Sequence, residues 1–113
     1  MINHHKLIQI KQKFSSYAIN DLNERIRSEI ADIRLDKLIK PGDSIAITAG
    51  SRGISDINLI TKTVIDEVIK LHGRPFIIPA MGSHGGATAN GQIDVLAGYG
   101  ITENKMGAPI KAT

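Results

Sequence analysis

The stretch Phe76-Ile-Ile-Pro-Ala-Met-Gly-Ser-His-Gly-Gly-Ala-Thr88 decides the fold that the sequence predicts. Its first three residues form an apolar run that suits a strand, and a polar stretch compatible with a helix follows from Ala89 to Leu96. The loop 79–88 between them holds three glycines, two hydroxyl side chains and one histidine. A helix N-terminus after such a loop offers N–H groups and a partial positive charge to an anion, and a histidine can exchange a proton near neutral pH. Turn geometry alone also favours glycine here, so the loop by itself leaves a binding site and a plain turn both open.

The same order of strand, loop and helix occurs earlier in the chain. Asp43-Ser-Ile-Ala-Ile-Thr48 is a short apolar run that suits a buried central strand of a parallel sheet, and the loop 49–55 follows with two glycines. Ser55 or Asp56 can cap a helix, and Gly73 is a natural stop for it. We expect this helix to bury a stripe of apolar residues at intervals of three and four: Ile57, Ile60, Val64, Val68 and Leu71.

The first forty residues predict one strand and one helix. Residues 6–14 alternate apolar and polar side chains, which is typical of a strand at a sheet edge. Asp21, with Glu24 three residues later, predicts the start of a helix, and Pro41-Gly42 ends the segment. The apolar face of this helix is predicted to comprise Leu22, Ile26, Ile30 and Ile33.

Strands separated by helices predict a parallel sheet with right-handed crossovers. We therefore expect residues 1–113 to form a single α/β domain, a small three-layer Rossmann-like domain with a mainly parallel sheet. Residues 101–113 show no strong element and do not read like a natural domain end. The expectation is an N-terminal part of a larger two-domain protein.

Composition narrows the class of protein. The chain has 113 residues, of which 42% are hydrophobic and 22% charged, as expected for one globular domain. It contains no cysteine, which excludes disulfides, thiolate metal ligands and a cysteine nucleophile. The formal charge is +3, but acids are interspersed among the basic residues, so we expect no nucleic-acid partner. We see no signal peptide and no apolar run of bilayer length, and expect a cytoplasmic protein without a membrane partner.

Both glycine-containing loops follow strands, and ligands of open parallel sheets bind outside the carboxyl ends of the strands. If the two strands are neighbours, a crevice brings together Ser51, Arg52, Ser83 and His84. An arginine, a histidine and free N–H groups favour a small anion, either a carboxylate or a phosphate. Neither loop fits a known phosphate motif, and a surface arginine that caps a carbonyl and a histidine in a structural hydrogen bond remain the plain alternatives.

The other histidines are weaker candidates. His4 and His5 lie in a terminus that we expect to fray, and His72 lies at a helix end where the dipole alone favours a cation. No pair of histidine or acidic residues has metal-ligand spacing, so we predict no metal ligand in this chain.

At these two loops the sequence resembles a known family. Ala49-Gly-Ser-Arg-Gly-Ile54 and Pro79-Ala-Met-Gly-Ser-His-Gly-Gly-Ala-Thr88 resemble the N-terminal domain of nickel-dependent lactate racemases, in the branch of homologues with these motifs. Tyr99-Gly-Ile-Thr-Glu103 and Met106-Gly-Ala-Pro-Ile110 resemble the next segments of that domain in the same branch. The resemblance covers residues 41–113.

The resemblance implies a two-domain enzyme that racemises or epimerises 2-hydroxy acids with a nickel-pincer nucleotide between its domains. His84 matches the catalytic histidine of the N-terminal domain, and Arg52 matches an arginine that holds substrate or cofactor anions. The lysine tether, the nickel-binding histidine and a second catalytic histidine belong to the missing C-terminal domain. The residues expected to bind substrate or cofactor are Ser51, Arg52, Gly53, Gly82, Ser83, Gly85 and Gly86.

Ala49 departs from the lactate racemases, which have an aspartate there, so the resemblance implies the reaction class rather than lactate itself. A small phosphate- or nucleotide-binding module without catalysis is the alternative function. On the first hypothesis the isolated chain is catalytically inert and associates with itself through the wall of its half-site.

Overall fold

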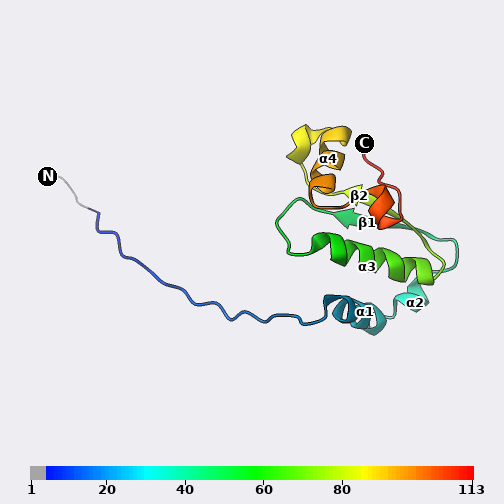
Figure 1. Ribbon diagram of the computed structural model, residues 1–113, viewed down its shortest axis with the longest axis horizontal. Coiled ribbons are helices and arrows are strands. Elements are labelled where there is room, and N and C mark those ends of the chain that lie inside the picture. Colours follow the sequence, from blue (N-terminus) through cyan, green and yellow to red (C-terminus); the bar gives the residue numbers. More distant parts are fainter. Residues whose placement is uncertain (1–4) are drawn as a thin grey trace.

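The computed structural model describes residues 5–113, so His4 lies outside the described residues. Figure 1 shows the helices and strands gathered into one body, from which residues 5–20 extend as an arm. The elements in chain order are α1 (Leu22–Asp32), α2 (Leu35–Leu38), β1 (Ser44–Ala49), α3 (Ile57–Lys70), β2 (Arg74–Pro79), the 3-10 turn η1 (His84–Ala87), α4 (Ala89–Gly98) and α5 (Glu103–Met106).

The two strands form a parallel sheet, as the sequence predicts. Ser44 lies opposite Arg74 and Ala49 lies opposite Pro79, so both strands end at the same edge. Ile110 adds a single parallel bridge to Ile77, where the Ile77 N–H donates to the carbonyl of Pro109 at 2.8 Å. Neither this bridge nor α5 is indicated by the sequence pattern. The fold is therefore a small α/β fold with a two-stranded parallel sheet.

Only one face of β1 is covered. Along the strand exposed and covered residues alternate, with Ser44, Ala46 and Thr48 exposed. The prediction of a strand buried on both faces is therefore wrong, because no element in residues 5–113 covers the second face. Ala49 and Ile77 share one core with residues of α3, α4 and α5.

The core on the covered face is small and aliphatic. Its largest fully buried side chains are Ile65, Ile77, Leu96, Ile101 and Val68. Burying a side chain of this kind stabilises a fold by about 1.5–3 kcal/mol. Among residues 5–113, no helix combines the length and the apolar character needed to cross a membrane.

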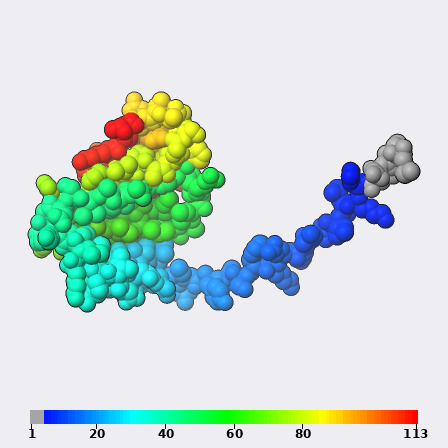
Figure 2. Space-filling model, turned by 180° about the vertical axis from the view of Figure 1, so that it is seen from behind, coloured from blue at the N-terminus to red at the C-terminus, as the bar shows by residue number. Residues whose placement is uncertain are grey.

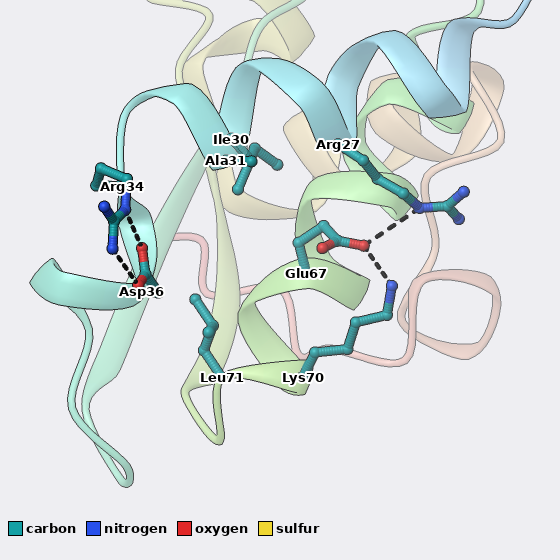
Figure 3. A pocket seen from close by; sticks show the side chains of 8 residues that line it. All are labelled: Arg27, Ile30, Ala31, Arg34, Asp36, Glu67, Lys70 and Leu71. Atoms are coloured by element: carbon teal, nitrogen blue, oxygen red, sulfur yellow. Dashed lines mark hydrogen bonds and ion pairs between the residues drawn. The ribbon is translucent and has the colours of Figure 1, made fainter.

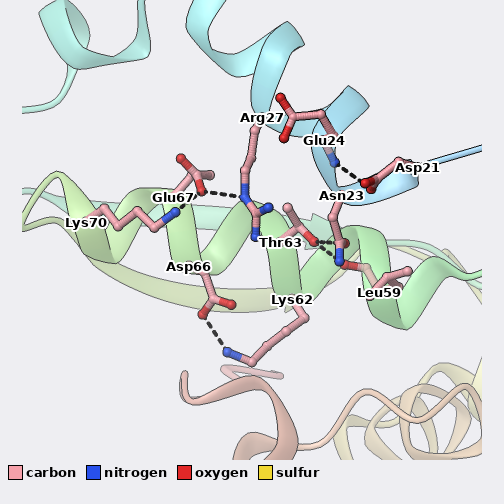
Figure 4. A network of polar contacts seen from close by, with 10 residues as sticks. All are labelled: Asp21, Asn23, Glu24, Arg27, Leu59, Lys62, Thr63, Asp66, Glu67 and Lys70. Atoms are coloured by element: carbon pink, nitrogen blue, oxygen red, sulfur yellow. Dashed lines mark hydrogen bonds and ion pairs between the residues drawn. The ribbon is translucent and has the colours of Figure 1, made fainter.

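Helix α3 buries more of its surface than the predicted stripe. Ile65 is completely buried, and Thr61 and Thr63 are buried although both are polar. The Thr63 hydroxyl lies 2.9 Å from the carbonyl of Leu59 and 2.7 Å from Oδ1 of Asn23 on α1. Figure 4 shows this contact between the helices. The helix buries a second side because α1 packs against it, and an i−4 carbonyl satisfies each buried threonine.

The predicted start of α1 is confirmed, but its end comes earlier than Pro41. The Asp21 carboxylate accepts a hydrogen bond from the Glu24 N–H at 3.0 Å. Helix α1 ends at Asp32, because Arg34 adopts a left-handed conformation with φ of 55°. Ile33, predicted to lie on the apolar face, is consequently 61% exposed.

The strand predicted for residues 6–14 is wrong. This segment forms neither helix nor strand, and Figure 2 shows it extending from the body. Ile8 is 83% exposed, Ile10 86% and Phe14 79%. Alternating side chains favour a strand only where a partner edge and an apolar face receive them, and here neither does.

Candidate functional site

The two glycine-containing loops meet beyond the carboxyl ends of β1 and β2. The Ala80 N–H donates to the carbonyl of Ala49 at 2.8 Å, which extends the pairing of the strands into the loops. Between the loops lies a hollow of about 390 Å³. Its lining comprises Gly50, Ser51, Arg52, Ala80, Met81, Gly82, Ser83 and His84.

The predicted convergence of Ser51, Arg52, Ser83 and His84 is present in this hollow. The Ser51 Oγ forms a hydrogen bond with Nδ1 of His84, although the residues lie 33 positions apart. Ser51 is half-buried, whereas Arg52 and His84 are exposed at the mouth. The parallel register produces this arrangement, because it brings the ends of both strands to one edge.

Three predicted site residues lie outside the lining. Gly53 follows the lined part of the first loop, and Gly85 and Gly86 lie in η1, both with left-handed backbone. The role of Gly85 is steric, because a side chain there would place its Cβ 2.5 Å from the backbone of Gly91. Because neither Gly85 nor Gly91 has a side chain, the loop can pass directly over the first turn of α4.

Gln92 in α4 and Tyr99, the residue that caps its C-terminal end, hold the site loops, and neither was predicted from the sequence. The Gln92 amide donates to the carbonyl of Gly82 at 2.9 Å and to that of His84 at 3.3 Å. The Tyr99 hydroxyl, at the end of the helix, donates to the carbonyl of Ser51 at 2.6 Å. Nothing in the local pattern marks them, because a glutamine early in a helix and a tyrosine at its end are ordinary residues. One helix therefore fixes both loops.

The hollow is cationic. Its lining contains one arginine and one histidine but no carboxylate. In the part of the chain that the structure describes, Arg52 forms no ion pair, and the residue three positions before it is the buried Ala49. Arg52 is thus available to an anion from solution.

A second hollow of about 350 Å³ lies between α1, α2 and the end of α3. Figure 3 shows that its charged groups face one another. Arg27 and Lys70 both contact Glu67, and Arg34 forms two 3.1 Å hydrogen bonds with Asp36. The hydrogen bonds from Arg34 lower the pKa of the Asp36 carboxyl. Because its charges are already paired, we do not place the functional site here.

No group of three or more histidine, cysteine or acidic side chains in residues 5–113 is arranged to hold a metal ion. Comparison of the chain with protein-family models, curated proteins and solved structures finds no match in any of the three.

Proposed function

We propose that the two loops form one wall of a site for a small 2-hydroxy acid, in an enzyme that racemises or epimerises its substrate. The observation that supports this most is the convergence of Ser51, Arg52 and His84 in one hollow without a carboxylate. The resemblance of both loop motifs to nickel-dependent lactate racemases supplies the reaction class.

Arg52 would bind the carboxylate of the substrate. A guanidinium offers two parallel N–H donors to a carboxylate, and this bidentate pairing fixes the orientation of the acid as well as its position. Since no acid of the lining competes for Arg52, the substrate supplies the balancing charge. Holding the reacting carbon in one place is itself a large part of catalysis.

His84 would exchange the proton of the 2-hydroxyl group. Its Nδ1 contacts Ser51, and the opposite nitrogen, Nε2, has no hydrogen-bond partner among residues 5–113. A general base works best with a pKa close to the working pH, which suits an imidazole. An imidazole can return the same proton when the opposite configuration forms.

A nickel-pincer nucleotide fits this wall in part. Arg52 and the glycine backbone fit the anionic groups of a nucleotide, whereas the lining holds no lysine and only one histidine. When bound, such a group supplies acceptance and return of a hydride. The chain's own residues contribute anion binding and proton transfer, and the tether and metal ligands would come from a C-terminal domain.

The uncovered face of the sheet supports the proposal of a larger, three-layer protein. Ser44, Ala46 and Thr48 face away from the core, and parallel sheets occur almost only with both faces covered. We propose that further elements of a two-domain, Rossmann-like protein cover this face.

The unpaired Arg52 also favours the alternative function, a phosphate- or nucleotide-binding module without catalysis. The two functions differ in what the isolated chain binds. A half-site offers one arginine and should bind a hydroxy acid weakly, with a Kd in the millimolar range or above. A complete module should bind a mononucleotide orders of magnitude more tightly.

NMR titration of the ¹⁵N-labelled chain tests the proposal. We expect lactate and larger 2-hydroxy acids to shift the amide signals of residues 50–53 and 82–84. Arg52→Gln should abolish these shifts, whereas the matched control Arg25→Gln, on the exposed face of α1, should leave them. Micromolar binding of a mononucleotide without any effect of hydroxy acids would instead favour the binding module.

A further inference from the structure

We propose that Ser51 is a positioning residue that holds the proton of neutral His84 on Nδ1 and so leaves Nε2 free to act as the base. This inference rests on the proposed function, because it assigns the protonation state that His84 needs in that site.

Both partners of this contact are held in place by α4. Ser51 is fixed through its carbonyl, which accepts the hydroxyl of Tyr99, and His84 through its carbonyl, which accepts the amide of Gln92. Their side chains meet across two loops that join different strands to different helices. Because the backbone of both residues is held in this way, the contact between their side chains is suited to setting the orientation of the imidazole ring.

The role of His84 as a base determines which atom donates the hydrogen bond between His84 and Ser51. A neutral imidazole carries one proton, and a base at Nε2 requires that this proton lie on Nδ1. Nδ1–H then needs an acceptor, and the Ser51 Oγ is the partner that the structure provides. When Nε2 takes the hydroxyl proton, Nδ1 remains protonated and the same hydrogen bond persists. When the proton returns to the substrate oxygen, the ring recovers its starting tautomer.

The opposite assignment makes Ser51 a nucleophile whose hydroxyl donates to Nδ1. Activated serines of that kind depend on a third group, usually a carboxylate, that orients the histidine through its other nitrogen. No carboxylate in residues 5–113 forms a hydrogen bond with His84, and none lines the hollow. The geometry therefore favours positioning over nucleophilic attack.

The test is the tautomer of His84, read from its ring ¹⁵N and ¹³C shifts in the full 113-residue chain at alkaline pH. We expect Nδ1–H to predominate in the wild-type chain and in Ser51→Thr, which keeps a hydroxyl. Ser51→Ala should change the tautomer ratio toward Nε2–H by about fivefold, the size expected for one hydrogen bond. Ser55→Ala removes a hydroxyl from the same loop outside the hollow and should leave the ratio unchanged.

A predominance of Nε2–H in the wild-type chain would overturn the proposal, and so would an unchanged ratio in Ser51→Ala. Covalent labelling of Ser51 by a serine-directed phosphonate would overturn it in favour of a nucleophile. If Ser51→Ala folds poorly, the tautomer measured in the wild-type chain and in Ser51→Thr still tests the proposal. Binding of hydroxy acids at Arg52 is a separate measurement, so failure here is distinguishable from failure of the proposed function.

Discussion

Gly91 shows how closely single residues are fitted around the site. A Cβ built at this position would lie 1.8 Å from the carbonyl oxygen of Gly85, which is backbone and cannot rotate away. Gly91→Ala should therefore destabilise the fold by about 3 kcal/mol and displace the loop that carries His84.

Denaturant unfolding of the variants measures this effect. Gly98→Ala lies in the same helix with nothing within 4 Å of the added carbon, and should stabilise the chain by up to about 1 kcal/mol. Equal stability of the two variants would show that the contact between Gly85 and Gly91 does not constrain the loop.

The pair of Arg34 and Asp36 predicts a pH effect. Two hydrogen bonds from the guanidinium favour the ionised carboxyl in the folded state, so the pKa of Asp36 is lower there than in the unfolded chain. The pair thus contributes stability above the unfolded-state pKa, and this contribution is lost as the pH falls through the folded-state pKa. Arg34→Gln should raise the pKa of Asp36 toward its ordinary value of 3.8.

A pH titration of the carboxyl carbon of Asp36 by NMR checks this expectation. Arg25→Gln removes a different surface arginine and should not change the titration. If the midpoint of Asp36 stays the same in Arg34→Gln, the pairing is absent in solution.

At the residue scale, the sequence predicted the groups with distinctive chemistry and missed those that support them. Arg52 and His84 stand out because they follow strands in glycine-containing loops, where side chains serve ligands more often than packing. Gln92 binds the carbonyls of Gly82 and His84 in the preceding loop, and Tyr99 binds the carbonyl of Ser51, 48 residues earlier in the chain. Such contacts depend on where α4 lies in space, which no local pattern records.

At the element scale, α4 is the part of the fold that organises the site. Tyr99 at its end anchors the loop after β1, although α4 itself follows β2. Tyr99→Phe removes one hydrogen bond and should destabilise the chain by about 1 kcal/mol. It should also speed hydrogen exchange of the amides in residues 50–54, because the loop loses its tie to the helix.

Tyr17→Phe is the control for this variant, since that tyrosine is 92% exposed. Exchange rates in residues 50–54 that are equal in both variants would mean that the anchor does not restrain the loop.

Elements with both a periodic pattern and a neighbour to pack against were predicted well. The strands at 44–49 and 74–79 overlap the predicted runs 43–48 and 76–78, and α3 between them ends shortly before Gly73. Residues 6–14 have a strand pattern of equal clarity and form no strand. An alternating pattern shows which side chains a strand could bury, but it does not show whether a neighbouring strand is present to pair with it. The bridge at Ile110 involves one residue, too few for a pattern.

At the scale of the whole molecule, the exposed apolar residues of the N-terminal arm predict that copies of the chain associate with one another. Leu7, Ile8, Ile10 and Phe14 are all at least 79% exposed, and large apolar side chains that find no cover within their own chain can be covered by association with another. Removal of residues 1–14 should lower self-association while changing the melting temperature by less than about 2 °C. Sedimentation at several concentrations compares the two chains, and equal association of both would place the contact elsewhere on the molecule.

The most direct test of the central claim is the rate of stereochemical inversion of 2-hydroxy acids by the two-domain protein that we propose, loaded with its cofactor. Inversion should fall at least a hundredfold in His84→Gln, roughly the scale of a lost general acid–base catalyst. The matched variant His72→Gln changes an exposed histidine outside the hollow and should retain the wild-type rate. A wild-type rate in His84→Gln would contradict the claim that this histidine exchanges the substrate's proton.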